Sequence, residues 1–556
     1  LALAAVTDDG RLLLHFERAR TNFLTGEVTL TPTLIELGYV GNASHVLISA
    51  SLRDLFVVER SGLLHYYDIS HLDAARLVRS ERAFDDARTE VTAAAHLLGA
   101  VSLIIGGSDG SVRQWFLTRD QDKQRQLTMI RAFKRHRAPV TMIAPELSRK
   151  GFVTGDATGN IALHYPTSHN TLLRERIAQT GIIEAAISPR NNALFVTDAA
   201  GVLRYFDVRN EHPDFSLSAL WHKVWYENRD APEYVWQSSS ATDEFESKYS
   251  LVPLTVGTLK AAFYAMLFAM PLSIMGAVYS AYFMSRRMRG WTKPTIEIME
   301  ALPTVILGFL AGLWFAPYVE HHLPAMFSIL LLMPLSFLAV SLLWTRPANA
   351  LRTRIGMGWE AALLIPVVLL VGWFCISLSP WMELWFFGGD MRQWLTDVGI
   401  NYEQRNAMIV GVAMGFAVIP NIYSIAEDAV FNVPKHLTQG SLALGATTWQ
   451  TVTRVVLLTA SPGIFAALMI GFGRAIGETM IVLMATGNSP VVNFNIFEGL
   501  RTLSANIAVE MPEAEYGSTH YRILFLSALV LFVFTFVVNT LAEMVRQRLR
   551  RRYSAI

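Results

Sequence analysis

The chain has 556 residues, of which 52% are hydrophobic and 17% charged, with a formal net charge of +1. A charged fraction below the roughly one quarter of ordinary globular domains favours a membrane protein with a soluble part. The single cysteine, Cys375, excludes a disulfide framework and a cysteine-based zinc site. Charges are frequent up to about Ser250, and membrane-length apolar runs occur only beyond it.

The first part of the chain contains an internal repeat, a turn that ends in glycine and leads into an alternating apolar strand. The five turn glycines are Gly10, Gly62, Gly110, Gly159 and Gly201. Their spacing of about forty to fifty residues is the period of a four-stranded propeller blade. We expect an all-β, WD40-like propeller domain of about five visible blades over residues 1–221, followed by a linker over residues 222–250.

Seven stretches beyond Ser250 are long and apolar enough to span a bilayer, which needs about twenty residues. They cover residues 255–283, 296–318, 325–345, 359–380, 406–426, 460–485 and 521–545. Basic residues crowd the first connection, the third connection and the C-terminal tail, which the positive-inside rule places in the cytoplasm. These residues are Arg286, Arg287, Arg289, Lys293, Arg346, Arg352, Arg354, Arg546, Arg548, Arg550, Arg551 and Arg552.

An odd number of spans with a cytoplasmic C-terminus places residues 1–250 on the outer side. Such a domain must be exported, yet the sequence opens at Leu1 with neither an initiator methionine nor a signal peptide. We therefore expect a membrane anchor and earlier blades to precede Leu1. In the outer connections, the adjacent His321 and His322 lack a third ligand with suitable spacing, so we expect no metal site.

Two charged residues, Arg474 and Glu478, interrupt the span predicted over residues 460–485. Residues four apart share one face of a helix, so we expect the two side chains to lie one turn apart. A charge at the centre of a membrane helix costs roughly 2.5–3.5 kcal/mol. The two charges therefore either neutralise each other and fix helix packing, or line a pathway for a charged solute. We favour the pathway, because a guanidinium can donate two parallel hydrogen bonds to an oxyanion.

Other residues near the spans have two readings each. Lys260 and Glu300 are candidates for the pathway or for structural roles. Gly471, Gly473 and Gly477 do not have the spacing of a dinucleotide fingerprint, and small residues at such intervals let membrane helices approach closely.

The cytoplasmic segment between the fifth and sixth spans covers residues 427–458. Pro434 can start a helix, Gly445 divides the segment, and the run TTWQTVTRVVL has one polar and one apolar face. From the spacing alone, this run could simply lie in the headgroup layer.

The run SLALGATTWQTVTRVVL, followed by PGIFAALMIGFGRAIGETM, resembles the EAA loop and next helix of binding-protein-dependent ABC importer permeases. The similarity is greatest to the phosphate permeases, PstC-like proteins, and covers most of residues 251–345 and 405–545. It extends to LVPLTVGTLKAAFYAMLFAMPLSIMGAVYSAYF and TIEIMEALPTVILGF. The resemblance implies transport roles for Arg474 and Glu478. It also implies an ATPase coupling loop that contains Gln439, Gly440, Ser441, Gly445 and Ala446.

The chain departs from the family pattern in several places. The triplet reads Gln439-Gly440-Ser441, so the acidic first position is absent, and Leu457-Leu458 stands where Leu-Pro is usual. The absence of this acidic residue puts the strength or regulation of ATPase coupling in question. The spans over residues 325–380 and the β domain look inserted relative to the family core.

The chain has no G-x-x-x-x-G-K-[ST] phosphate loop, so we expect a transporter subunit and no enzyme, with ATP hydrolysis on a partner. The resemblance implies four partners: a second permease (PstA-like), an ATPase (PstB-like), a periplasmic phosphate-binding protein (PstS-like) and phosphate itself. It also implies contact with membrane lipid in a multi-pass protein of the bacterial inner membrane, with residues 1–250 periplasmic. We expect no cofactor and no nucleic acid. The alternatives are another oxyanion, a secondary transporter, or a membrane-anchored propeller sensor.

Overall fold

The computed structural model describes residues 2–21, 28–71, 74–120, 122–240, 245–344 and 364–553. The chain divides into two compact units. The β unit consists of Leu1–Ser250 with Gly517–Thr519, and the membrane unit consists of Leu251–Tyr516 with His520–Ile556. Strands make up the first unit and long apolar helices the second, so the predicted order of an all-β region followed by a helical membrane region is confirmed.

Within the described ranges, the β unit has five successive antiparallel sheets of three or four strands and one short hairpin. The five sheets are β1 (Ala2–Val6), β2 (Arg11–Thr21) and β3 (Val28–Tyr39); β4 (Ala43–Ile48), β5 (Asp54–Glu59), β6 (Leu63–Asp68) and β7 (Arg76–Arg82); β8 (Val91–His96), β9 (Leu103–Gly107), β10 (Val112–Arg119) and β11 (Arg125–Ala132); β12 (Val140–Pro145), β13 (Phe152–Asp156), β14 (Asn160–Tyr165) and β15 (Asn170–Arg176); and β16 (Ile182–Ile187), β17 (Ala193–Asp198) and β18 (Leu203–Asp207).

Each predicted turn glycine joins equivalent strands of its sheet. Gly62, Gly110, Gly159 and Gly201 connect the second strand to the third, and all have φ between 75° and 89°. A side chain disfavours this left-handed conformation, which explains why glycine recurs there. Gly10 connects β1 to β2, so β1 is equivalent to β5 and the first sheet starts at its second strand.

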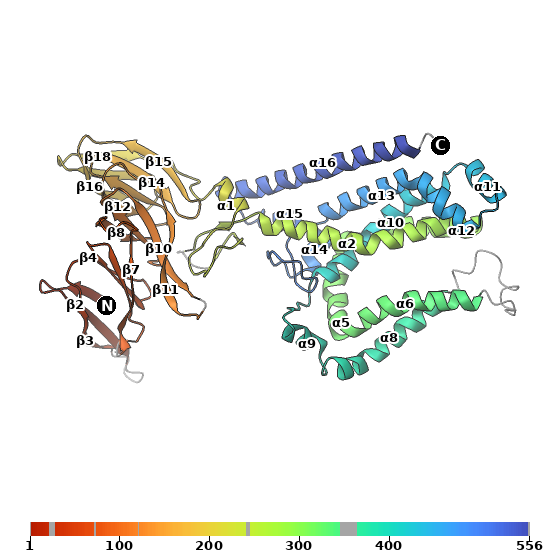
Figure 1. Ribbon diagram of the computed structural model, residues 1–556, viewed down its shortest axis with the longest axis horizontal. Helices are drawn as coiled ribbons and strands as arrows, with labels where there is room; N and C mark the ends of the chain where they lie inside the picture. The colour runs from red at the N-terminus through yellow and green to blue at the C-terminus, as the bar shows by residue number, and fades with distance from the viewer. Residues whose placement is uncertain are drawn as a thin grey trace. The chain divides into compact units, whose positions relative to one another are not determined.

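The sheets follow one another as an arc within the β unit, from β2 and β3 at one end to β16 and β18 at the other (Figure 1). The first strands pack in series, β4 against β8, β8 against β12, and β12 against β16. None of the described sheets closes into a barrel, so a closed propeller ring stays a prediction.

A buried polar network holds the fourth sheet. His136 lies before β12, and its Nδ1 is 3.2 Å from Asp156 Oδ2 while its Nε2 is 2.7 Å from Thr154 Oγ1. The same hydroxyl lies 2.9 Å from His164 Nε2, and His164 Nδ1 lies 3.1 Å from Thr171 Oγ1. Burial lowers the pKa of His164 to about 3, so this imidazole is neutral in the folded β unit at neutral pH.

The described part of the predicted linker, residues 222–240 and 245–250, lies against the sheets. After α1 (Leu217–Trp221), the strands β19 (Trp236–Gln237) and β20 (Lys248–Tyr249) pair as a hairpin. Glu227 accepts a 2.7 Å hydrogen bond from Lys150 Nζ and one of 2.5 Å from Ser102 Oγ. We call residues 222–250 the strap.

The membrane unit consists of helices, some of which contain single π-helical turns labelled η. They are α2 (Val252–Val278), η2 (Tyr279–Phe283), α3 (Arg286–Glu300), α4 (Thr304–Leu310), η3 (Ala311–Phe315), α5 (Ala316–His321), α6 (Leu323–Trp344), α8 (Leu364–Phe386), α9 (Met391–Asp397), α10 (Ala407–Phe431), α11 (Lys435–Ala443), α12 (Thr448–Thr451), η5 (Val452–Val456), α13 (Leu457–Gly477), α14 (Met480–Ala485), α15 (Leu503–Glu510) and α16 (Thr519–Tyr553).

Among the described residues, six helices are long and apolar enough to span a membrane, and one bent pair brings the number to seven. The prediction of about seven spans is therefore confirmed. In the bent pair, α3 and the helix Thr304–His321 meet at 84°. Pro303 precedes the second helix, and a proline disfavours helical backbone in the residue before it. Arg346, Arg352, Arg354 and the part of the predicted fourth span before Leu364 lie outside the described residues.

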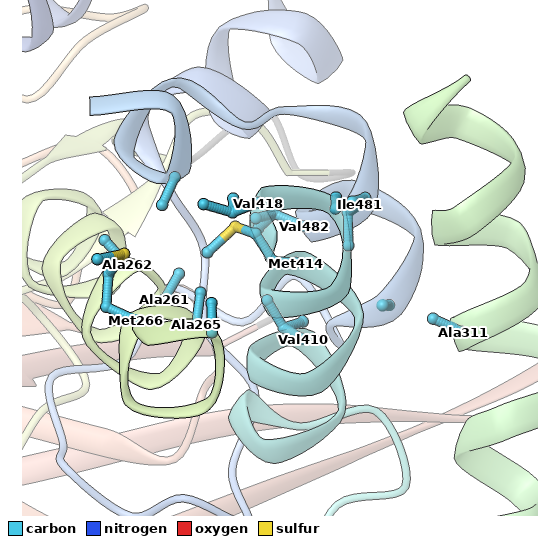
Figure 2. Close-up of a cluster of buried hydrophobic side chains, with 14 of the residues drawn as sticks. Ala261, Ala262, Ala265, Met266, Ala311, Val410, Met414, Val418, Ile481 and Val482 are labelled. Carbon is cyan, nitrogen blue, oxygen red and sulfur yellow. The ribbon is translucent and has the colours of Figure 1, made fainter. Parts of the chain in front are cut away.

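The core of the membrane unit is built from small and branched side chains of α2, α10, α14 and η3. Figure 2 shows Ala261 and Ala265 of α2 facing Val410 and Met414 of α10. On α10, a Cβ added at Gly411 would lie 2.9 Å from the Cβ of Tyr264. Because lipid is as apolar as these side chains, close packing of this kind supplies much of the helix association.

Candidate functional site

The sequence placed Arg474 and Glu478 on one helix, and the structure corrects this. Helix α13 ends at Gly477, and Glu478 has extended backbone with φ −65° and ψ 129°. The low helix propensity of glycine at the end of α13 favours the break. Glu478 Oε1 instead accepts hydrogen bonds of 3.2 Å and 3.3 Å from the backbone N–H groups of Met480 and Ile481, and so caps α14. The predicted span over residues 460–485 is shifted, because the helix runs from Thr448 to Gly477.

Arg474 pairs with another candidate residue. Its Nη1 lies 3.0 Å from Oε1 of Glu300, the last residue of α3. The Arg474 side chain is 27% exposed and that of Glu300 is 42% exposed. The guanidinium is therefore held by one carboxylate but remains accessible to a small solute.

The two helix breaks on either side of this ion pair lie close together. Helices α4 and η3 follow the first break and pack against α14, which follows the second. The packing is tight at two glycines of α4 and η3. A Cβ added at Gly308 would lie 2.8 Å from Met480 O, and one at Gly312 would overlap Met484 O. The spacing G-x-x-x-G at these positions is the usual device for close approach of membrane helices.

The region around the Arg474–Glu300 ion pair and the two helix breaks has the properties expected of a passage for a polar solute. Non-helical backbone at membrane depth is tolerated only where it is buried in protein or lines a water-filled cavity. Here both breaks, residues 301–303 and 478–479, accompany an arginine and two glutamates. The carbonyl oxygen of Glu478 accepts a 2.9 Å hydrogen bond from Ser504 Oγ, so α15 also helps to hold the second break.

A charged ladder that the sequence analysis missed attaches α3 to α10. Glu427 of α10 is completely buried, with Arg289 Nη2 2.5 Å from its Oε1 and Lys293 Nζ 3.1 Å from its Oε2. Lys293 also lies 2.6 Å from Asp428 Oδ1. One turn further along α3, Glu297 accepts a 3.0 Å hydrogen bond from Ser424 Oγ.

The ladder gives α3 its register along α10. Residues 289, 293 and 297 are each four apart and therefore lie on one face of α3. The four-residue spacing was the available signal in the sequence, where Arg289 and Lys293 predict a cytoplasmic connection but not their carboxylate partner. The next residue near this face is Glu300, so the ladder places the carboxylate that meets Arg474.

Lys260 has structural partners. It is buried, and its Nζ donates a 2.7 Å hydrogen bond to Asn493 Oδ1 and a 3.4 Å hydrogen bond to the carbonyl oxygen of Glu498. These contacts tie α2 to the segment that follows α14 and favour the structural role over the pathway role. Among the three predicted glycines, Gly471 makes the expected close approach, to Ile422, whereas a Cβ added at Gly477 would meet nothing within 4 Å.

The predicted coupling loop is a helix, a turn and a second helix. Gln439, Gly440 and Ser441 lie in α11, which begins directly after Pro434. Gly445 has φ 88°, so it makes the turn that the sequence predicted. Thr447 then caps α12 in a capping box with Gln450, which begins the helix that continues through α13.

Two contacts and two exposed side chains define the shape of this loop. Ser441 Oγ lies 3.0 Å from Thr451 Oγ1, and the Ala446 N–H donates to the carbonyl oxygen of Ser441. Leu444 and Trp449, by contrast, are 92% and 67% exposed. A loop fixed by its own hydrogen bonds that presents large apolar side chains is suited to bind another protein.

A comparison with known protein families covers most of the membrane unit. The family described as binding-protein-dependent transport system inner membrane component matches residues 269–551, a range that includes both helix breaks and the loop. A probable ABC transporter permease protein, YqgH of Bacillus subtilis (strain 168), is 25% identical over 307 residues, which cover 54% of this chain and 74% of the relative.

Two relatives are named phosphate transport system permease protein PstC. The protein from Mesorhizobium japonicum is 28% identical over 251 residues, 43% of this chain and 75% of its own. The protein from Xylella fastidiosa (strain Temecula1) is 30% identical over 235 residues, 41% and 72% of the two chains. Among solved structures, the computationally designed Ika8 protein has a TM-score of 0.27 at 16% identity, with 37% of this chain and 54% of that chain covered, which carries no argument about the fold.

Proposed function

Because the chain belongs to the family of binding-protein-dependent transport system inner membrane components, we propose that it forms a translocation pathway for inorganic phosphate across the bacterial inner membrane. Transport is driven by a separate ATPase subunit. Similarity to proteins named phosphate transport system permease supports phosphate as the solute. The observation that carries the proposal is the accessible Arg474–Glu300 ion pair between two helix breaks.

Phosphate crosses by exchange at Arg474. The guanidinium holds the Glu300 carboxylate while the site is empty, and an entering oxyanion replaces that carboxylate with its own oxygen atoms. The planar fork of arginine donates two parallel hydrogen bonds to such an anion, whereas Glu300 accepts a hydrogen bond of 3.0 Å from Arg474 Nη1 through its Oε1. Glu478 lies on the same route and acts by repulsion of the passing anion.

Conformational change reaches this site along α3 and α13. The loop at Gly445 docks on the ATPase subunit through Leu444 and Trp449, and its second helix continues directly to Arg474. The charged ladder on Glu427 makes α3 move with α10, so that Glu300 and Arg474 shift relative to each other.

The remaining partners are a second permease subunit, a periplasmic phosphate-binding protein and membrane lipid. Residues 1–250 are periplasmic and the C-terminus is cytoplasmic in this arrangement.

Uptake of phosphate into proteoliposomes tests the proposal. The vesicles contain this chain with its second permease and ATPase, and the phosphate-binding protein is added outside. Arg474→Gln should reduce uptake to the background, and Glu300→Gln should lower the KM for phosphate, because the competing carboxylate is removed. Arg548→Gln, an exposed arginine of the α16 tail, is the matched control and should transport like the wild type.

Glu478→Gln separates the two roles of that residue. The glutamine oxygen can still accept the hydrogen bonds that cap α14, so a purely structural Glu478 tolerates the change. A loss of uptake as large as that of Arg474→Gln supports a role in the pathway.

The same assay distinguishes the alternative functions. Uptake without ATP would favour a secondary transporter, and preferred uptake of sulfate or molybdate would favour another oxyanion as the solute. Full uptake by Arg474→Gln would overturn the mechanism, and absence of uptake by the wild type would leave a membrane-anchored sensor as the alternative.

A further inference from the structure

A second candidate site lies entirely within the β unit. A cavity of about 380 Å³ opens between the second and third sheets, where the β4–β5, β8–β9 and β10–β11 turns gather. The strap closes one side with Asn228 and Asp230. This volume is within the range of small-molecule sites, which is roughly 300–1,000 Å³.

Three arginines line the cavity, Arg53, Arg119 and Arg125. Two carboxylates accompany them, and both already have partners. Asp54 pairs with Arg125 at 3.0 Å and accepts a 2.9 Å hydrogen bond from the Tyr66 hydroxyl.

Asp230 accepts a 2.9 Å hydrogen bond from the backbone N–H of Arg119. In the parts of the chain that the structure describes, neither the Arg53 nor the Arg119 guanidinium forms an ion pair. The three arginines and two carboxylates give the lining a net charge of +1, and two of its guanidinium groups are free of ion pairs among the described residues, which favours a negatively charged ligand.

Three large apolar side chains also line the cavity. They are Phe56, Val101 and Leu117, of which Phe56 is buried, and we call them the apolar wall. A site for a bare inorganic ion needs only convergent polar groups, whereas apolar side chains beside charged groups recognise a molecule with an apolar part and a charged end.

The backbone around the cavity is held in a fixed shape. Ala100 and Asn228, which line it, have φ of 49° and 61°, in the left-handed region that non-glycine residues adopt at a cost of about 1–2 kcal/mol. Such conformations persist only where the surroundings impose them. On the strap, Glu227 is anchored to Lys150, and Asp230 to the Arg119 amide, so Asn228 lies between two anchored residues and Asp230 is itself anchored.

We propose that this cavity binds a small organic oxyanion, with its phosphate or carboxylate group on Arg53 and Arg119 and its apolar part against Phe56, Val101 and Leu117. The site is separate from the membrane pathway and does not depend on the transport function proposed above. Its occupancy gives the β unit a ligand of its own.

Calorimetric titration of the full chain in detergent micelles with phenyl phosphate tests this inference. Phenyl phosphate carries a phosphomonoester and an apolar ring, and inorganic phosphate and phenol each supply one half of it. Arg53→Gln and Arg119→Gln should each weaken binding by roughly tenfold or more, since a charge-assisted hydrogen bond is removed. Arg190→Gln, at an exposed turn of the last sheet and without an ion pair among the described residues, is the control.

The membrane arginine is present in every variant, so any anion bound there contributes equally to all the titrations. Saturable binding of phenyl phosphate that both pocket variants weaken and Arg190→Gln does not weaken supports the site. No saturable binding, or binding that neither pocket variant changes, overturns it. Inorganic phosphate that binds as tightly as phenyl phosphate in an Arg53-dependent manner also overturns it, because the apolar wall then contributes nothing. Thermal unfolding of the variants should match the wild type, since neither guanidinium contributes an ion pair to the fold.

Discussion

Replacement of Glu427 by glutamine is expected to destabilise the membrane unit far more than the same change at its neighbour Asp428. Both carboxylates pair with Lys293, Glu427 at 3.1 Å and Asp428 at 2.6 Å. Their burial differs, because the Glu427 side chain is fully buried whereas that of Asp428 is 55% exposed. The comparison therefore varies burial while the charge removed and the shared partner Lys293 stay the same, and Glu427 has Arg289 as a second partner.

The magnitude follows from what each change leaves behind. Removal of one partner of a buried ion pair typically costs about 3–5 kcal/mol. Lys293 keeps Asp428, and Arg289 keeps its position 3.5 Å from the ring centroid of Phe431, so we expect the lower end, about 3 kcal/mol. Asp428→Asn removes an exposed pair and should cost less than about 1 kcal/mol.

Equilibrium unfolding of the purified variants in mixed detergent micelles measures both values. Residual uptake by refolded Glu427→Gln would also fall, because α3 loses its register on α10. If the two substitutions cost the same, or if Glu427→Gln costs less than about 1 kcal/mol, then burial does not decide the strength of this ladder and the reasoning is refuted.

Three further predictions concern a turn, a helix contact and a buried histidine. Gly445→Ala should reduce ATP-driven uptake, because alanine at φ 88° costs about 1–2 kcal/mol, whereas Gly440→Ala, at a helical position of α11 with open space around it, should reduce uptake less. Gly312→Ala should lower the thermal midpoint of the membrane unit, because its Cβ overlaps Met484 O, while Gly290→Ala, with open space around it, should not lower it. His164→Phe should flatten the dependence of β-unit stability on pH between about pH 6.5 and pH 4.5, measured by circular dichroism on the full chain.

The sign of the pH effect follows from the lowered pKa of His164. The unfolded chain takes up a proton near pH 6.5, whereas the folded β unit does so only near pH 3, so His164 makes stability fall as the pH decreases through this window. The slope is at most about 1.4 kcal/mol per pH unit. Burial raises the pKa of Glu246 to about 7, which opposes this trend, so the test is the difference in slope between wild type and variant. An unchanged slope in His164→Phe would contradict the role of His164 in the pH dependence. Equal uptake by the Gly445 and Gly440 variants would contradict the prediction for the turn. Equal thermal midpoints of the Gly312 and Gly290 variants would contradict the prediction for the helix contact.

Much of the fold could be predicted because its signals are local. The apolar runs are long enough to span a membrane whatever their partners are, and the five repeat glycines mark turns that any sheet of this kind needs. The helix break after Gly477 was missed, because a glycine and a glutamate within an apolar run do not by themselves end a helix. The sixth span also begins earlier than predicted, because the amphipathic run from Thr448 belongs to the same continuous helix.

The sequence by itself determined which residues carry charge into the membrane unit, where the loop turns, and that the chain has an all-β part and a spanning part. Tertiary structure alone decided how those charges are paired. Arg474 meets Glu300 rather than Glu478, and Glu427 gathers Arg289 and Lys293 from a segment more than a hundred residues earlier. The physical reason is that an ion pair depends on distance in space, which helix breaks and helix packing set and which spacing along the chain reports only within one unbroken helix.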